Sequence, residues 1–443
     1  MRKSLYLFSI VAGLGGFLFG FDTAVVNGAL PYFREFFQIN MAVEGWVVSS
    51  ALVGCLAGAM FIGYFGDRYG RREMLKLMGL LLVISAIGSG LANDTTTFII
   101  FRIIGGLGVG GASVLSPMYI TEISPAKFRG RLTIIFQMAI VIGILVAFAS
   151  DLALINLGGN NWRWMFIVET IPGLIFTGLL FFVARSPRWL VANGRNEEAQ
   201  KVIETVNTLA DSRIVLEDIQ ASINEDVIHH YSVLFKKPYF RLILIGIVVG
   251  MLNQFTGINV VMYYSTDIFR SAGFSTESGI MQTIIIGATN LAFTILAMSL
   301  IDKIGRKTML LIGALFMSVF LGFLSWFFLS ETEGYAVLIM LIMFVAFFAF
   351  SQGAVIWVIL SEMFPNNIRA RATSIGSSSL WFFCALTTFL FPVIKDSFKD
   401  TSGMGYVFAF YAVMTLFSFF FFKKYLIETK GKTLEELEKE VLK

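Results

Sequence analysis

The chain contains apolar stretches of about 20 residues along nearly its whole length, and this feature restricts its fold more than any other. About 20 mostly apolar residues are what a helix needs to cross the hydrocarbon core of a bilayer. Twelve stretches qualify, at approximately 5–31, 43–65, 76–92, 97–121, 132–152, 163–184, 240–267, 278–301, 308–330, 336–361, 372–394 and 404–425. We therefore predict an all-α membrane protein with twelve transmembrane helices.

The composition agrees with a chain whose main solvent is lipid. Apolar residues make up 56% of it and charged residues 14%, whereas a soluble protein carries about 25% charged residues. Cys55 and Cys384 both lie in apolar stretches, where we interpret them as packing residues. His229 and His230 stand in a polar stretch, and a solvated loop accounts for them. The Met1-Arg2-Lys3 start imitates a signal peptide, but the apolar run that follows is too long for one.

Basic residues are divided unevenly between the loops on the two sides of the predicted bundle. Cytoplasmic loops of membrane proteins carry an excess of Lys and Arg. If both termini are cytoplasmic, the four short inner loops hold twelve basic residues and the outer loops hold five. The inner set is Arg68, Arg71, Arg72, Lys76, Lys127, Arg129, Arg131, Lys303, Arg306, Lys307, Arg369 and Arg371, and the outer set is Arg34, Arg163, Arg270, Lys395 and Lys399. We therefore expect a multi-pass protein of the plasma (inner) membrane with both termini in the cytoplasm.

One long polar segment separates six apolar stretches from the other six. Within it, an Asn196-Glu197-Glu198 start before a spaced apolar run has the form of a capped amphipathic helix. We predict an N-terminal six-helix bundle at 1–184, a cytoplasmic helical linker at 185–238, a C-terminal six-helix bundle at 239–425 and a cytoplasmic tail at 426–443.

Two short motifs occur once in each half. The first comprises Asp67, Gly70, Arg71 and Arg72, and its second copy is Asp302, Gly305, Arg306 and Lys307. The second comprises Glu122, Pro125, Arg129 and Arg131, and its second copy is Glu362, Pro365, Arg369 and Arg371. Because the motifs return in the same order at nearly the same offset, they predict two related halves with a binding site between them, near the bilayer midplane.

Several strings carry a family resemblance that extends over essentially the whole chain. The string GYFGDRYGRR at 63–72 resembles the signature loop of the major facilitator superfamily; its glycines permit a tight turn, and Asp67 can accept charge-assisted hydrogen bonds. The others are RIIGG at 102–106, PMYITE at 117–122, SPRWL at 186–190, NQFTGIN at 253–259 and ETKG at 428–431. Together they resemble the sugar porter family, which includes bacterial xylose/proton symporters and facilitative glucose transporters.

Amides and tryptophans inside the apolar segments are the candidates for sugar contact. Amides can both donate to and accept from sugar hydroxyls without introducing a charge, and aromatic rings match the C–H face of a sugar. Compared with the family motifs, the candidates are Gln137, Asn253, Gln254, Asn259, Asn290, Trp357 and Trp381. For any single amide, an interhelical hydrogen bond is an alternative role, and for Trp357 packing is one.

The chain departs from the family pattern at four positions in or near the candidate sugar site. Asn253 replaces the first of two usual glutamines, Leu380 precedes Trp381 where an amide is usual, and Ile144 replaces a glutamine of the xylose symporters. Ala354 follows Gly353 where proline is usual. The first three changes leave a pentose or a hexose open as the substrate, and the last bears on how the tenth helix bends.

The seventh predicted helix combines the binding motif with a candidate gate. Gln254 and Asn259 lie five residues apart around Gly257, so both reach one sugar only if the helix breaks there or the cavity is wide. Tyr263 and Tyr264 follow toward the outer end, and we predict that they belong to an extracellular gate, with aromatic packing as the alternative.

The repeated motifs place acids and bases at the inner ends of helices. Glu122, Arg129, Glu362 and Arg369, together with Asp67, Arg71, Asp302 and Arg306, are predicted to form ion pairs that close the cytoplasmic side between the bundles. Ordinary surface ion pairs, worth about 0 to 1 kcal/mol each, are the alternative.

Asp22 is the candidate proton-coupling residue. A charge near the bilayer centre costs about 2.5 to 3.5 kcal/mol even on a lenient scale, so Asp22 must have a partner or be protonated. Arg102, the basic residue of the fourth predicted helix, lies at a similar depth. We predict a switch in which Asp22 is ionised beside Arg102 and takes a proton when Arg102 leaves. In the family, proton symporters have Asp at this position and facilitative transporters commonly Asn. A static ion pair is the alternative.

These features predict an alternating-access secondary transporter that imports a monosaccharide coupled to protons through Asp22. A facilitative uniporter is one alternative. A sugar sensor is another, although sensors of this family typically carry long cytoplasmic tails. We expect no enzyme activity, because the sequence has no nucleotide loop, metal-ligand cluster or nucleophile with a base. We also expect no cofactor and no nucleic-acid partner, and a protein that functions as a monomer in the bilayer.

Overall fold

The computed structural model of the chain describes residues 3–125, 129–206, 212, 215–217, 219–221, 239–365, 368–398 and 402–430. The regular elements in these ranges are helices, which confirms the predicted all-α class. Before residue 239 they are α1 (Lys3–Phe37), α2 (Met41–Tyr69), α3 (Arg71–Leu91), α4 (Thr95–Ile123), α5 (Arg129–Leu154), α6 (Asn161–Ile167), α7 (Thr170–Leu179), α8 (Pro187–Ala192) and α9 (Asn196–Val206). After it they are α11 (Tyr239–Gln254), α12 (Ile258–Ser271), α13 (Thr276–Ile304), α14 (Arg306–Leu329), α15 (Tyr335–Phe348), the π-turn η3 (Ala349–Gly353), α16 (Ala354–Glu362), α17 (Arg369–Ser397) and α18 (Ser402–Tyr425).

Eleven helical spans in the described ranges are long and apolar enough to cross a bilayer, against twelve predicted. The difference is the predicted segment 163–184, which is divided between α6 and α7. Pro172 causes the division. It has no N–H to donate to the Val168 carbonyl four residues earlier, and in a regular helix its ring would clash with that carbonyl. The N–H of Ile171 instead donates to the Val168 carbonyl at 3.1 Å, and the chain turns at Val168 and Glu169.

The chain forms two compact units that cut across the predicted halves. Unit 1 contains Met1–Asp22, Gly54–Ile144 and Phe166–Val227, and unit 2 contains Thr23–Val53, Leu145–Met165 and Ile228–Lys443. One end of α1, one end of α2 and one end of α5 therefore belong with the helices of the second half. The division of the chain into domains at 184, 238 and 425 stays a prediction.

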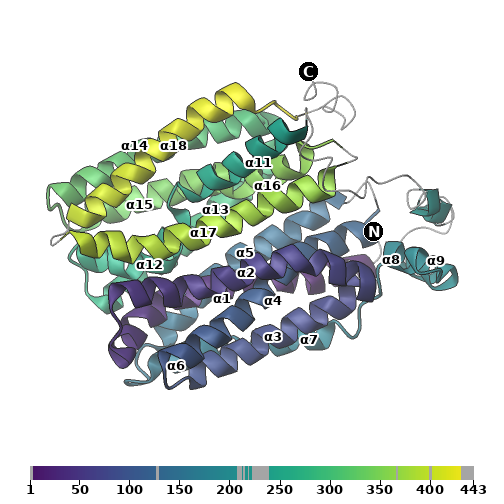
Figure 1. Cartoon of the computed structure of the whole chain (residues 1–443), viewed down its shortest axis with the longest axis horizontal. Coiled ribbons are helices and arrows are strands. Elements are labelled where there is room, and N and C mark those ends of the chain that lie inside the picture. Colours follow the sequence, from purple (N-terminus) through teal and green to yellow (C-terminus); the bar gives the residue numbers. More distant parts are fainter. Residues whose placement is uncertain are drawn as a thin grey trace. The chain divides into compact units, whose positions relative to one another are not determined.

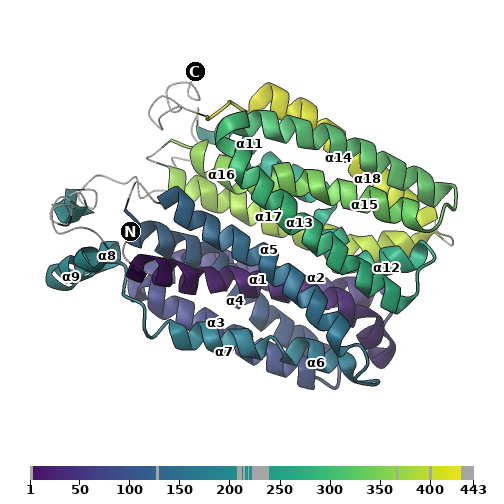
Figure 2. The ribbon, with the colours of Figure 1, turned by 180° about the vertical axis from the view of Figure 1, so that it is seen from behind.

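In unit 1, α3 packs against α4 and α7, as Figures 1 and 2 show. Both views also place α8 and α9 beyond one end of these helices, near the start of α1. Trp189 of α8 holds them there, since its indole N–H donates to the Asp67 carbonyl at 2.9 Å. Its ring also lies against Gly70, whose φ of +94° makes the turn between α2 and α3.

Helices α1 and α5 pack so closely that glycines of α1 lie against the backbone of α5. A Cβ on Gly16 would lie 2.6 Å from the Phe136 carbonyl oxygen, and one on Gly20 would lie 1.9 Å from the Ile140 carbonyl oxygen. Only a residue without a side chain fits at either position. This packing fixes how α1, which carries Asp22, lies against its neighbour.

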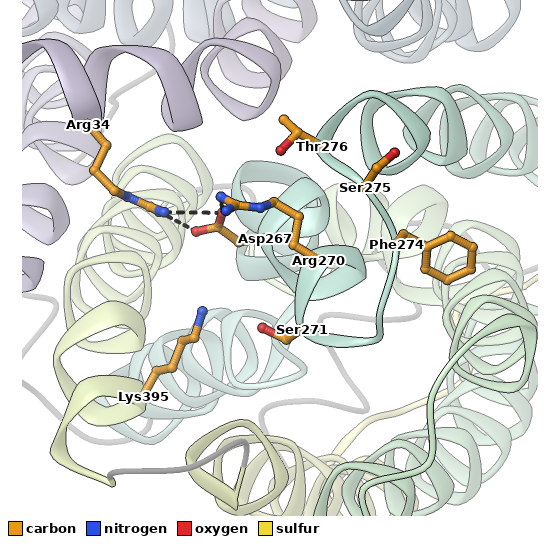
Figure 3. Close-up of a pocket in the computed structure, with 8 residues that line it drawn as sticks. All are labelled: Arg34, Asp267, Arg270, Ser271, Phe274, Ser275, Thr276 and Lys395. Atoms are coloured by element: carbon orange, nitrogen blue, oxygen red, sulfur yellow. Dashed lines mark hydrogen bonds and ion pairs between the residues drawn. The ribbon is translucent and has the colours of Figure 1, made fainter.

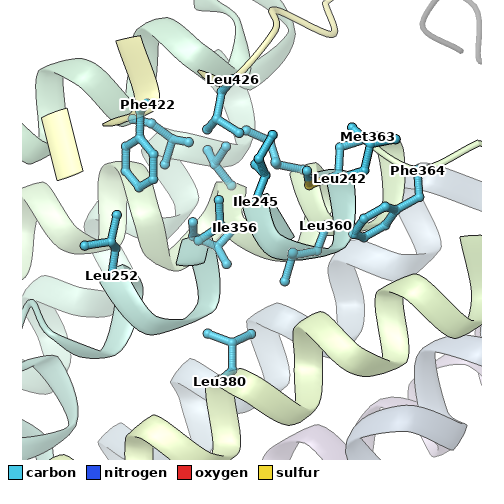
Figure 4. Packing of buried hydrophobic residues seen from close by; sticks show 14 of the residues in the cluster. Leu242, Ile245, Leu252, Ile356, Leu360, Met363, Phe364, Leu380, Phe422 and Leu426 are labelled. Carbon is cyan, nitrogen blue, oxygen red and sulfur yellow. The ribbon is translucent and has the colours of Figure 1, made fainter. Parts of the chain in front are cut away.

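In unit 2, α14 packs along α18 and α11 along α17. Figure 4 shows the apolar cluster that joins α11, α16 and α18, with Ile245, Leu252, Ile356, Leu360 and Phe422 among its members. Gly305 turns the chain between α13 and α14 with φ of +100°, close to the value at Gly70. The repeated motif thus makes the same turn in both halves.

Candidate functional site

Asp22 and Arg102 meet inside unit 1. The Arg102 Nη1 donates to the Asp22 Oδ1 at 2.5 Å, and its Nη2 lies 3.5 Å from the Asp22 carbonyl oxygen. The two side chains are 1% and 5% exposed. Arg102 also lies 5.5 Å from the centre of the Phe166 ring. The predicted contact is therefore present, and its role in proton coupling stays a prediction.

Glu169 adds a second carboxylate to this place. It stands at the turn between α6 and α7, is 2% exposed, and lies close enough to Asp22 and Arg102 for both charges to act on it. Its Oε1 has no hydrogen-bond partner among the described residues. Because one guanidinium cannot balance two buried carboxylates, the group is neutral only if it holds one proton.

Four amides form a continuous row in unit 2. Asn259 donates to the Gln254 Oε1 at 2.5 Å, Gln254 donates to the Asn253 Oδ1 at 2.9 Å, and Asn253 donates to the Gln352 Oε1 at 3.1 Å. The Nε2 of Gln352 has no hydrogen-bond partner among the described residues. A row of this kind can exchange its internal hydrogen bonds for bonds to the hydroxyls of a ligand.

Two interruptions in helices bring the row together. Gly257, with φ of +80°, separates α11 from α12, so the predicted break of the seventh helix is confirmed. Gln352 lies in η3, the π-turn that joins α15 to α16. The tenth predicted helix therefore bends through a π-turn just before Ala354, the position where the family usually has proline.

The other sugar candidates lie on four helices. Asn290 of α13 and Trp381 of α17 are buried, and the Asn290 Oδ1 lies 3.4 Å from the Thr294 hydroxyl. Trp357 of α16 is 39% exposed, and Gln137 of α5 is partly buried. Gln137 belongs to unit 1 and the remaining candidates belong to unit 2.

A group of charges lies in unit 2 where α1, α2, α12 and α17 meet, and we call it the Arg34 cluster: Arg34, Glu44, Asp267 and Lys395. Arg34 forms ion pairs with both carboxylates, which are almost completely buried. Figure 3 shows the Lys395 side chain directed toward the Arg34–Asp267 pair across a cavity of about 530 Å³. Arg270 stands at the edge, 3.7 Å from the Asp267 Oδ1.

Further contacts join α1 and α17 to α12 beside this cluster. The Asn27 side chain of α1 donates to the Ser265 hydroxyl and accepts from the Thr266 N–H, both at 2.9 Å. Tyr264 is buried and donates to the Thr388 carbonyl of α17 at 3.2 Å, while its ring packs 4.9 Å from that of Phe391. Tyr263 is buried as well. These contacts join α1 and α17 to α12 at this end of unit 2, and the gating role of the two tyrosines stays a prediction.

The repeated motifs build two networks of the same design. In unit 1, Arg71 lies 2.7 Å from an Asp67 oxygen and donates to Glu122 at 3.0 Å, and Glu122 accepts from the Ser186 hydroxyl. In unit 2, Arg306 lies 2.8 Å from an Asp302 oxygen and 3.5 Å from a Glu362 oxygen. There the Thr429 hydroxyl donates to Glu362 at 2.5 Å. Each network ties together elements of its own unit.

The side chains of Arg129 and Arg369 lie outside the described residues, as does Lys127. The contacts of Glu122 and Glu362 given above are those within their units. An ion-pair gate between the bundles therefore stays a prediction.

The sequence analysis passed over several of the buried groups, notably Glu169, Gln352 and the Arg34 cluster. A signal was available for the first two, because Glu169 is the one acid of the predicted segment 163–184 and Gln352 the one amide of 336–361. The cluster carries no such signal, since its members lie near the ends of their helices, where charges are ordinary.

Comparison with known proteins gives a consistent result over the whole chain. Residues 8–441 match the family described as sugar (and other) transporters. The chain is 38% identical to the arabinose-proton symporter of Bacillus subtilis over 98% of this chain and 94% of that protein, and 38% identical to the D-xylose-proton symporter of Escherichia coli over 98% and 96%. Its structure is similar to the inward-open form of the xylose transporter of E. coli, with a TM-score of 0.86 and 35% identity over 98% of this chain and 99% of that one. With helices that fit a membrane, a buried ion pair and the repeated loop motifs also present, the chain belongs to the family of sugar transporters.

Proposed function

We propose that the protein is a secondary transporter that imports a monosaccharide together with protons by alternating access, with Asp22 as the coupling residue. The buried group of Asp22, Arg102 and Glu169 carries the proposal. It contains two acids and one base, all almost completely buried, so its charge balance depends on one proton. The relatives named as arabinose-proton and xylose-proton symporters support the same function.

The coupling step follows from this charge balance. While Arg102 pairs with Asp22, the proton resides on Glu169. When a movement of α1 against α4 draws the guanidinium away from both carboxyls, Asp22 is left in an apolar site and becomes neutral by taking a second proton from the solvent, while Glu169 keeps the first. The conformations on either side of this step therefore differ in their affinity for protons, which is what coupling requires.

The sugar site is proposed to comprise Gln137, Asn253, Gln254, Asn259, Asn290, Trp357 and Trp381, with Gln352 as an addition. The row of amides supports this, because each amide can replace a bond to its neighbour with one to a sugar hydroxyl. Removing one such bond costs about 1 to 3 kcal/mol when a polar group is left unpaired. Gln254→Ala should therefore weaken sugar binding by roughly 5- to 150-fold.

The orientation follows from the basic residues of the loops, with the Arg71 and Arg306 networks in the cytoplasm and the Arg34 cluster outside. Both termini are then cytoplasmic, in the plasma (inner) membrane. We further propose that the bundles 1–184 and 239–425 are the moving bodies, that 185–238 links them, and that a monomer suffices. The joined ends of α1 and α12 then correspond to an extracellular side that is closed.

Accumulation of labelled arabinose, xylose or glucose in proteoliposomes tests the coupling. With the outside more acidic than the inside, the wild type should accumulate sugar, and Asp22→Asn should lose this accumulation while keeping counterflow. Asp94→Asn is the matched control, because it removes an exposed carboxylate while asparagine still caps α4.

Other outcomes select other functions. Accumulation that survives Asp22→Asn would remove Asp22 as the coupling residue. A wild type that performs counterflow without accumulation would be a facilitative uniporter, and one that binds sugars without counterflow would be a sensor.

A further inference from the structure

Asp151 of α5 is a buried carboxyl that the mechanism above does not use. It is 1% exposed, and no side chain of the described residues donates a hydrogen bond to its carboxyl oxygens. Glu169, by comparison, has Arg102 beside it. An ionised carboxylate without a cation in such surroundings costs several kcal/mol, so the group is neutral instead.

The position of Asp151 is set by the backbone of α1. A Cβ on Gly28 would lie 2.4 Å from the Asp151 Oδ2, so glycine alone leaves room for the carboxyl. On its other side, α5 turns Leu145 and Phe148 toward Gly287 of α13. Asp151 is therefore buried between α1 and α5.

The charged groups on the neighbouring elements are too distant to stabilise a charge here. On α1, Asp22 and Arg34 each lie six residues from Gly28, about 9 Å along the helix axis. On α13, Glu277 lies ten residues from Gly287, about 15 Å away along the axis. Arg163 of α6 is stacked on the rings of Phe36 and Trp162 instead. Tyr32 of α1 lies one turn beyond Gly28 and Glu35 about two turns beyond it, and the group of α1 that hydrogen-bonds toward the Asp151 carboxyl is the Gly28 backbone.

We propose that Asp151 is a second proton-binding site, which holds its proton while the extracellular side is closed. The inference rests on the proposed function only for the assignment of the two sides. Asn27, the residue before Gly28, makes the hydrogen bonds to Ser265 and Thr266 that join α1 to α12. Opening this end breaks those bonds and admits water beside Gly28.

Proton binding is thereby linked to closure of the outer side. In the open state water solvates the carboxyl, which releases its proton to the solvent outside. On closure the water leaves, and the carboxylate must first take a proton from a hydronium ion, forming the O–H bond of the neutral acid. Ionised Asp151 thus opposes closure, whereas Asp22 couples the transport step itself.

Infrared spectroscopy of the purified protein tests the protonation state without relying on transport. At pH 7.5 the wild type should show carbonyl absorption from two protonated carboxylic acids, Asp151 and Glu169. Asp151→Asn should lose one of these two components, whereas Asp94→Asn should keep both. If both components persist in Asp151→Asn, the proposal is overturned; the component that remains should disappear in Glu169→Gln. Asp151→Ser, which is also small and uncharged, replaces the asparagine variant if that one does not fold.

Counterflow at equal pH on both sides tests the link to closure. In the Asp22→Asn background the rate should fall at alkaline pH by up to tenfold per pH unit, the limit for one proton. In Asp22→Asn/Asp151→Asn this fall should disappear. A fall that persists would overturn the proposal, whereas failure of the proposed coupling is read separately, from sugar accumulation by Asp22→Asn.

Discussion

The buried group of Asp22, Arg102 and Glu169 makes a quantitative prediction about non-additive stability. Arg102 is 1% exposed and its guanidinium lies 2.5 Å from the Asp22 Oδ1, while Glu169 is a second carboxyl close enough to interact with it. Removing one partner of a buried ion pair costs about 3 to 5 kcal/mol when the other charge is left uncompensated. In this protein a single substitution does not leave Arg102 uncompensated, because the other carboxylate can ionise.

Asp22→Asn and Glu169→Gln should therefore each be mild, at about 1 to 2 kcal/mol, close to the loss of one hydrogen bond to a charged group. The double variant leaves the guanidinium without a carboxylate and should cost at least about 4 to 6 kcal/mol, which exceeds the sum of the singles by about 2 kcal/mol. Thermal unfolding of the four purified proteins, followed by circular dichroism in one detergent, measures the difference.

The control is Asp22→Asn combined with Asp94→Asn, whose carboxyl is exposed at the start of α4. Those two substitutions should add within about 0.5 kcal/mol, as distant sites do. If the changes in unfolding free energy of Asp22→Asn and Glu169→Gln also add within about 0.5 kcal/mol, then Glu169 does not share Arg102 with Asp22. The charge balance that supports proton coupling would then be incorrect.

Three other predictions concern the helix break at Gly257, the Arg34 cluster and Tyr263. Gly257→Ala should destabilise the protein by about 1 to 3 kcal/mol, because φ there is +80° and the new Cβ would lie 2.3 Å from the Tyr411 ring. Gly322→Ala, inside α14 with open space around it, should not destabilise the protein in the same unfolding assay and should raise its stability by up to about 1 kcal/mol. Arg34→Met should leave Glu44 and Asp267 facing each other and lower stability by about 2 to 4 kcal/mol, and equal unfolding temperatures for variant and wild type would show that the Arg34 cluster is not a structural latch. Tyr263→Ala should increase access of a membrane-impermeant thiol reagent to a cysteine placed at Asn259, and unchanged labelling would support plain aromatic packing.

The periodic features of the fold could be predicted from the sequence because each rests on local chemistry. Apolar length gave the spans, Gly257 gave the break between α11 and α12, and the repeated Asp-to-Arg motif gave two turns with φ near +100° at Gly70 and Gly305. The contact between Asp22 and Arg102 was predictable as well, because a charge in a membrane helix requires a partner and depth along each helix can be counted.

The features that the sequence did not predict depend on which faces of neighbouring helices meet. The row of amides ends in Gln352, which joins Asn253 because a π-turn rotates the end of α15. A π-turn has no reliable local signal, since it inserts a residue into an otherwise regular ladder. The burial of Asp151 also became visible only once α1 was placed against α5. From the sequence alone, an acid three residues before the end of a helix is equally consistent with a solvent-exposed helix end.

The interruption at Pro172 links the fold to the proposed mechanism. In an unbroken helix Glu169 would lie in the hydrogen-bonded interior of the span, and its facing would be fixed by the residues on both sides. Because Pro172 has no N–H, the helical ladder is interrupted there, and the N–H of Ile171 donates to the Val168 carbonyl in a tighter turn between α6 and α7. Glu169 thus stands beside Asp22 and Arg102 at the turn where α6 ends and α7 begins. A carboxylate that must exchange a proton as its neighbours move is best placed at such a turn, and this argues for Glu169 as a participant in the proton step rather than a passive counter-ion.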